Sequence, residues 1–178
     1  EAIIVDPGDE PEKIVRQVEA AGLKVKYLVH THAHFDHIGG TGGVKAKTQA
    51  LVCLHADDKV IYDNLPMQGQ MFGMQFEKAP PIDKFLSDEE ILQFGHHKAQ
   101  VIHTPGHSPG GICLKLLDGD ESLFSGDTLF KQSIGRTDLW GGDGKQLIHS
   151  IKDRLLTLNT DITVFPGHGP STEIGFEK

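Results

Sequence analysis

The stretch that decides the fold is Thr31-His32-Ala33-His34-Phe35-Asp36-His37, which directly follows the apolar run Tyr27-Leu28-Val29. Side chains two residues apart in an extended segment point the same way, so His32, His34 and Asp36 can share one side. A tight bend after them lets His37 join the group. Neutral imidazoles and a carboxylate are ligands that suit Zn²⁺ and similar transition metals. The stretch therefore predicts a metal site at the end of a strand.

The segments around this stretch predict alternating strands and helices, which is typical of an α/β unit. The turn Asp6-Pro7-Gly8 ends a first strand, Pro11 can begin a helix, and Gly22 can end that helix. The glycines after His37 predict a flexible bend. In this half we expect strands over 2–5, 24–30 and 50–54, and helices from Pro11 to Gly22 and over 44–47.

The second half of the sequence predicts short strands and one long amphipathic helix. The segment Asp118-Gly119-Asp120 is a hairpin signal. Residues 64–81 show no clean period and are interpreted as a loop, either a flap over substrate or a packed surface excursion. We expect strands over 100–103, 112–117, 122–124 and 162–165, a helix over 147–158, and a single domain over 1–178 with two β/α halves that lacks a few N-terminal residues.

Composition narrows the class of protein. The chain has 178 residues, 38% hydrophobic and 24% charged, with a formal net charge of −8. An acidic chain without runs of Lys or Arg disfavours nucleic acid as a partner, and no apolar run is long enough to cross a bilayer. Cys53 and Cys113 lie in short apolar segments and are expected to be buried reduced thiols. No signal peptide is visible, which favours a cytoplasmic location.

Three further ligand candidates share one kind of setting. His107 lies in Thr104-Pro105-Gly106-His107-Ser108-Pro109-Gly110-Gly111, Asp127 in Ser125-Gly126-Asp127-Thr128, and His168 in Pro166-Gly167-His168-Gly169. Each directly follows an expected strand and is preceded by Gly, so the backbone can turn sharply there. Loops at strand ends are where rigid scaffolds present functional groups. Together with the first stretch, they predict one metal centre.

In this order the motifs resemble the metallo-β-lactamase superfamily, from the Asp6-Pro7-Gly8 turn to the C-terminus. The segment Gly126-Asp127-Thr128-Leu129-Phe130, followed by Gly135-Arg136-Thr137-Asp138-Leu139, resembles the short, single-domain glyoxalase II-like hydrolases. The resemblance implies an α/β (α+β) fold, the αββα sandwich of two mixed β-sheets flanked by helices, with metals at one edge.

The family pattern implies two divalent metal ions, and Asp127 would bridge them. Zinc is the expected metal, although such ligands also accept iron or manganese. Asp36 and Asp127 count as catalytic because they hold the ions, whose bridging hydroxide would attack a thioester carbonyl. The pattern assigns one ion to His32, His34 and His107, and the other to Asp36, His37 and His168.

Individual residues narrow the substrate that the resemblance implies and the roles of nearby side chains. Metallo-β-lactamases that hydrolyse antibiotics typically have another residue where this chain has Asp127, so antibiotic hydrolysis is not expected. The implied substrate is a small-molecule thioester such as S-lactoylglutathione. Arg136 could bind a glutathione carboxylate, or it could pair internally with Asp138. Asp6 could support a ligand or serve only as a turn residue.

Three alternatives stay open from the sequence. The site could be mononuclear, with His37 and His168 in other roles. The enzyme could instead be a mononuclear-iron persulfide dioxygenase, a branch that also carries a Gly-Arg-Thr-Asp segment, with His32, His107 and Asp127 as ligands. The ligands could also serve a non-catalytic, metal-stabilised binding domain. The sequence does not specify an oligomeric state.

Overall fold

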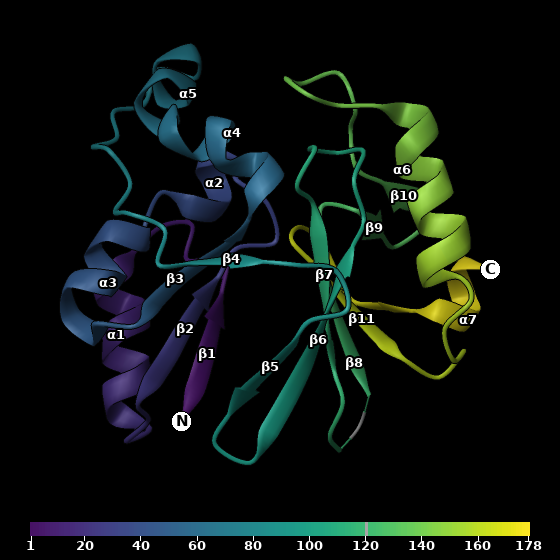
Figure 1. Ribbon diagram of the computed structural model, residues 1–178, viewed down its shortest axis with the longest axis horizontal. Coiled ribbons are helices and arrows are strands. Elements are labelled where there is room, and N and C mark those ends of the chain that lie inside the picture. Colours follow the sequence, from purple (N-terminus) through teal and green to yellow (C-terminus); the bar gives the residue numbers. More distant parts are fainter. Residues whose placement is uncertain (120) are drawn as a thin grey trace. The chain divides into compact units, whose positions relative to one another are not determined.

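The computed structural model describes residues 1–119 and 121–178, which form two compact units, residues 1–85 and 86–178 (Figure 1). Each unit has its own sheet, helices and hydrophobic core, which agrees with the expected two β/α halves. The single domain over 1–178 stays a prediction. Asp120, in the expected hairpin turn, lies outside the described residues. Within the described part of the chain, no helix is long and apolar enough to cross a membrane.

The first unit contains a four-stranded sheet in the order β1-β2-β3-β4, in which β1, β2 and β3 run parallel. Parallel neighbours need a crossover connection, and helices provide it between β1 and β2 and between β2 and β3. The strands are β1 (Ala2–Val5), β2 (Val25–Val29), β3 (Leu51–His55) and β4 (Lys84–Leu86). The helices are α1 (Pro11–Ala20), α2 (Phe35–Ile38), α3 (Thr41–Thr48), the 3₁₀ turn η1 (Ala56–Asp58), α4 (Lys59–Asp63) and α5 (Leu65–Met71).

The core of the first unit lies between the sheet and its helices. Helices α1 and α3 lie side by side, and α3 contacts β2 and β3 (Figure 1). Leu28 and Val52 from the strands and Val44 from α3 are fully buried. Each such side chain contributes roughly 1.5–3 kcal/mol by leaving water. The first sheet is thereby held rigid at the point where β2 ends and the metal-binding stretch begins.

The second unit contains a six-stranded mixed sheet in the order β12-β11-β8-β7-β6-β5 and a small pair, β9 and β10. Neighbours are antiparallel except β8 and β11, which run parallel. The strands are β5 (Ile91–Phe94), β6 (His97–His103), β7 (Ile112–Leu116), β8 (Ser122–Gly126), β9 (Leu129–Phe130), β10 (Ser133–Ile134), β11 (Thr163–Pro166) and β12 (Thr172–Glu173). The helices are α6 (Gly144–Ser150), which continues into the π-helical turn η2 (Ile151–Leu155), and α7 (Ile174–Glu177).

The predicted long amphipathic helix forms the other half of the second core. Leu147, Ile151 and Leu155 are buried and pack with Leu123 of β8 and Val164 of β11. Asp143 caps α6, because its Oδ1 accepts hydrogen bonds from the backbone N–H groups of the first turn. The apolar stripe predicted this helix, which is confirmed, whereas the cap by Asp143 was not predicted.

The interpretation of residues 64–81 as a loop is wrong in part, because Leu65–Met71 forms helix α5. Pro66 stands in the first turn, where a helix tolerates proline. Glycine usually weakens a helix. Here Gly69 is needed, because a Cβ at this position would lie 2.6 Å from the Phe76 ring. Phe76 lies seven residues after Gly69 in the chain, and no apolar periodicity indicated that it packs against α5. The two cysteines are free and buried, as expected.

The turn at Gly8 generates a stability prediction. A Cβ built at Gly8 would lie 1.9 Å from the carbonyl oxygen of Asp36, so G8A forces two backbone segments apart. We expect G8A to lower the free energy of unfolding by about 1–3 kcal/mol or more, because overpacked sites relax poorly. Urea unfolding of chelator-treated protein measures it.

G42A is the matched control. Gly42 lies in helix α3, and a Cβ built there has no heavy atom of the described residues within 4 Å beyond its chain neighbours and the backbone of its own helix. Alanine should raise the free energy of unfolding by up to about 1 kcal/mol, because it restricts the unfolded chain. Equal urea midpoints for G8A and the unmodified protein would contradict the prediction.

Candidate metal centre

The first unit brings together the ligand candidates of the opening stretch. Strand β2 ends at Val29, the chain continues extended through His34, and α2 carries Asp36 and His37. The His32 ring centroid lies 4.8 Å from that of His34 and 4.0 Å from that of His37. His37 Nε2 lies 3.7 Å from Asp36 Oδ2. The three imidazoles are buried, whereas Asp36 is exposed.

Asp6 orients two of these imidazoles. Its Oδ1 accepts from the Thr31 backbone N–H (2.7 Å), and its Oδ2 accepts from the Thr31 hydroxyl (2.6 Å) and lies 2.9 Å from His37 Nδ1. A carboxylate only accepts, so His37 carries its proton on Nδ1 and presents Nε2. The Thr31 hydroxyl donates its one hydrogen to Asp6, so the hydroxyl oxygen accepts a hydrogen bond from Nδ1 of His32 (3.0 Å). Asp6 therefore does more than form a turn.

The second unit gathers its three candidates at one edge of its sheet. Asp127 follows β8 and His168 follows β11, and these two strands are parallel neighbours with Gly126 opposite Pro166. The Gly167 backbone N–H also donates to the Gly126 carbonyl (2.8 Å). His107 lies in the loop between β6 and β7, and the Thr104 and Thr128 hydroxyls link that loop to the segment after β8 (3.1 Å). Strand register thus sets this arrangement.

One oxygen of Asp127 lies between two imidazoles. Asp127 Oδ2 is 3.7 Å from Nε2 of His107 and 3.7 Å from Nε2 of His168. These separations are too long for hydrogen bonds but suit ligands of a common cation, since two donors each about 2.1 Å from one ion lie at most about 4.2 Å apart. His107 is buried and His168 is exposed.

The segment from Gly135 to Asp138 positions His107. The Arg136 carbonyl accepts from His107 Nδ1 (2.7 Å), so Nε2 faces Asp127. A Cβ at Gly135 would lie 1.8 Å from the Asp127 carbonyl oxygen, so only glycine lets the segment pass this close. The sequence singled out this segment by resemblance, but the use of the Arg136 backbone oxygen was not predicted.

The donor set fits a transition-metal ion. In His32, His37 and His107, Nδ1 bonds to an oxygen of the protein, so Nε2 is the nitrogen that can bind a cation. Metal-binding histidines almost always show this arrangement, because the internal bond fixes the tautomer and the ring direction. Neutral imidazoles with carboxylates suit zinc, iron and manganese. The assignment of individual residues to ions stays a prediction.

The comparison with protein families decides the identity of the fold. The family described as "Metallo-beta-lactamase superfamily" matches residues 1–168. The chain belongs to the metallo-β-lactamase superfamily. The α/β fold with two helix-flanked sheets that the motifs implied is confirmed at the level of the superfamily and of the two units.

Relatives within the superfamily cover nearly the whole chain. Hydroxyacylglutathione hydrolase GloC of Haemophilus influenzae is 39% identical over 185 residues, which span 99% of this chain and 84% of GloC. The structure of TTHA1623 in a di-iron-bound form is 40% identical with a TM-score of 0.89, covering 97% of this chain and 84% of that one. BLEG-1 B3 metallo-beta-lactamase is 39% identical with a TM-score of 0.92, covering 99% and 85%.

A more distant structure is also similar over nearly the whole chain. ETHE1 from Myxococcus xanthus is 28% identical to this chain with a TM-score of 0.80, covering 98% of this chain and 70% of that one. The relatives therefore establish a superfamily of metal-binding hydrolases for this chain and leave the substrate to be argued from the site.

Arg136 is engaged in the structure. Its Nε donates to Asp138 Oδ1 (2.7 Å) and its Nη2 to Asp138 Oδ2 (2.8 Å). The guanidinium holds the pKa of the Asp138 carboxyl at about 2, well below its ordinary value. Both side chains are exposed. The internal pairing considered for Arg136 is thus present, and a role in substrate binding stays a prediction.

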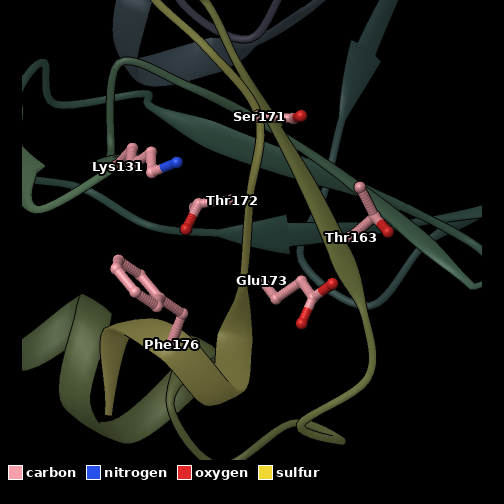
Figure 2. Close-up of a pocket in the computed structure, with 6 residues that line it drawn as sticks. All are labelled: Lys131, Thr163, Ser171, Thr172, Glu173 and Phe176. Carbon is pink, nitrogen blue, oxygen red and sulfur yellow. The ribbon is translucent and has the colours of Figure 1, made fainter.

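A separate pocket of about 310 Å³ lies in the second unit, on β11, β12 and the segments around them (Figure 2). The Lys131 ammonium lies 5.7 Å from the centroid of the Phe176 ring. The candidate ligands do not line this pocket, which is built from Lys131, Thr163, Ser171, Thr172, Glu173 and Phe176.

Two residues that the sequence did not flag hold the ligand loop of the first unit. The fully buried Asp58 accepts from the Ala33 backbone N–H through Oδ2 (2.9 Å), and Gln68 bonds to the backbone on both sides of His34. Their partners lie 25 or more residues away in the chain, so local spacing carried no signal for them.

The contacts of Asp6 generate the second prediction. In D6N one oxygen becomes an NH₂ group, which only donates, so the groups that donate to that oxygen lose their acceptor. We expect the free energy of unfolding of metal-free protein to fall by about 1–3 kcal/mol, because buried donors lose their acceptor. Urea unfolding in excess chelator measures the change.

Asp9 provides the comparison for this substitution. Within the described part of the chain, its exposed carboxylate accepts only a neighbouring backbone N–H, that of Glu10 (2.7 Å). D9N should therefore stay within about 0.5 kcal/mol of the unmodified protein. If D6N were no less stable than D9N, the orienting role of Asp6 would be wrong.

Proposed function

We propose that this chain is a dinuclear metal-dependent thioester hydrolase of the glyoxalase II type. It would convert an S-(2-hydroxyacyl)glutathione, such as S-lactoylglutathione, to a 2-hydroxy acid and glutathione. The observation that carries the proposal is the position of Asp127 Oδ2, 3.7 Å from Nε2 of both His107 and His168. A carboxylate oxygen shared between two imidazoles is what a bridging ligand requires. The 39% identity to GloC supports the choice of substrate class.

In this proposal the ligands are divided between two ions as the family pattern implies. One ion takes His32, His34 and His107, the other takes Asp36, His37 and His168, and Asp127 contributes to both. When bound, two such ions lower the pKa of water to about 7, polarise the carbonyl oxygen and stabilise the leaving thiolate. Zinc is our proposed metal, and iron is the tested rival because TTHA1623 binds two irons.

The residues of the chain supply orientation and access. The internal bonds of Nδ1 in His32, His37 and His107 direct their Nε2 atoms. Asp36 and His168 are each exposed, as access of a substrate requires. A cysteine nucleophile is disfavoured, because both thiols are buried. Burial also raises the pKa of the Cys113 thiol to about 11, which keeps it protonated at neutral pH.

We further propose Arg136 as a substrate-binding residue and a cytoplasmic location. The guanidinium could exchange Asp138 for a carboxylate of glutathione, because both are bidentate partners of the same geometry. The burial of Cys53 and Cys113 as thiols outside a disulfide supports a reducing compartment. We expect a small-molecule thioester as the partner, and neither nucleic acid nor a membrane.

The direct test uses purified, metal-loaded protein. We expect about two ions per chain by elemental analysis. We also expect S-lactoylglutathione turnover that H34A lowers on the order of 100-fold or more, since metal ligation supplies several kcal/mol to the transition state. Loss of the thioester absorbance measures turnover. If the unmodified protein matches H34A, the thioesterase proposal fails.

A panel of substrates separates the rivals in the same preparation. One iron per chain with uptake of oxygen would favour the persulfide dioxygenase alternative, which the likeness to ETHE1 fits. A β-lactam belongs in the panel because BLEG-1 is named a B3 metallo-beta-lactamase; we expect little cleavage of it because of Asp127. Metal binding without turnover of thioesters, lactones or phosphodiesters would favour a binding domain.

The proposed role of Arg136 predicts a difference between substrates. R136A should raise KM for S-lactoylglutathione about 10-fold, because a charge-assisted pair with a carboxylate is lost. KM for a thioester of an uncharged thiol should not change. D138N is the matched variant: it frees the guanidinium and should lower KM for the glutathione thioester. Steady-state kinetics on both substrates measure this, and an equal effect of R136A on both would contradict it.

A further inference from the structure

Gln68 of helix α5 holds the peptide groups on both sides of His34. The Phe35 backbone N–H donates to Gln68 Oε1 (3.0 Å), and Gln68 Nε2 donates to the Ala33 carbonyl oxygen (3.0 Å). The Ala33 carbonyl belongs to the peptide unit before the His34 Cα, and the Phe35 N–H belongs to the unit after it. One carboxamide therefore fixes both planes that meet at His34.

Fixing both planes fixes the direction of the His34 side chain. The backbone of His34 is extended, with φ −72° and ψ 149°, directly before helix α2 begins. The two flanking peptide planes determine φ and ψ, and these angles set where Cβ points. A residue in this position could otherwise adopt helical angles and turn its imidazole elsewhere. Gln68 replaces the neighbouring strand that would normally hold an extended segment.

The Gln68 amide fits in only one orientation. Its second N–H donates to the Ile61 carbonyl in helix α4 (2.8 Å). Swapping oxygen and nitrogen would set an N–H against the Phe35 N–H and an oxygen against two carbonyl oxygens. The amide is thus anchored to α4 and holds the ligand loop in a fixed position. Asp58 holds the remaining backbone group of Ala33 by accepting from its N–H (2.9 Å).

We propose that Gln68 is a positioning residue that presets His34 for the metal ion. The carboxamide clamps the loop in the ligand conformation before a cation arrives, so binding does not have to order the loop. This inference rests on the metal-binding part of the proposed function and does not depend on the thioester. Partners that orient metal ligands typically account for 10–100-fold in metal affinity.

Metal affinity of the full chain tests the proposal. Q68M keeps the length of the side chain and removes its polar groups, whereas Q68E keeps an acceptor for Phe35 but cannot donate to Ala33 or Ile61. We expect Zn²⁺ affinity, measured by competition with a chromophoric chelator, to fall by about 10–100-fold in both variants. The visible absorption of the Co²⁺-loaded protein should also change, because the His34 ligand is displaced. Q68E serves if Q68M does not fold.

Two controls separate positioning from general destabilisation. Q70M alters an exposed glutamine on the same helix and should leave affinity and the Co²⁺ spectrum unchanged. Y62F removes the hydrogen bond from the Tyr62 hydroxyl to the Pro80 carbonyl (2.9 Å) in the same region. It should lower the melting temperature of metal-free protein without a comparable change in Zn²⁺ affinity.

The outcomes distinguish this inference from the proposed function. If Q68M and Q68E fold and bind Zn²⁺ like the unmodified protein with the same Co²⁺ spectrum, Gln68 is not a positioning residue. The same holds if Y62F loses as much affinity as they do for an equal loss of stability. If the unmodified protein binds metal but cleaves no thioester, the proposed function fails and the effect of Gln68 on affinity still decides the inference.

Discussion

The direction of each buried imidazole is the constraint on which the rest of the site depends. A neutral imidazole has one N–H and one acceptor nitrogen, and it binds a cation only through the acceptor. The Nδ1 atoms of His32, His37 and His107 donate hydrogen bonds to oxygens of the protein. The acceptors are the Thr31 hydroxyl, the Asp6 carboxylate and the Arg136 carbonyl, respectively. Because these partners lie inside the protein, each tautomer is fixed without an ion. The folding free energy of the two cores is what keeps these partners in place.

Two glycines let the backbone approach the candidate ligands closely. Gly8 lies against the Asp36 carbonyl and Gly135 against the Asp127 carbonyl, and neither leaves room for a Cβ. In both places a segment from elsewhere in the unit passes beside a candidate ligand at backbone distance. These approaches let Asp6 reach Thr31 and let the Arg136 carbonyl reach His107.

What could be predicted from the sequence was local in the chain. The strand before His32, the helix from Pro11 and the amphipathic helix around Leu147 follow from apolar periodicity and turn residues, and the structure has them. The ligand candidates stood out by spacing. Helix α5 was missed because it contains Pro66 and Gly69, residues that usually indicate a loop. The contact of Gln68 with the ligand loop could not be predicted from local sequence patterns, because its partner Phe35 lies 33 residues away.

The parallel pairing of β8 and β11 has a consequence for the order of folding. Phe124 pairs with Phe165, so this register forms only after a long stretch of chain has been synthesised and looped back. Contacts of such high sequence separation form slowly, because loop closure costs entropy before the pairing rewards it. Asp127 and His168 come together only then, whereas Asp6 and His37 lie 31 residues apart near the start. A nascent chain therefore completes its N-terminal donors first, and the C-terminal donors become available last.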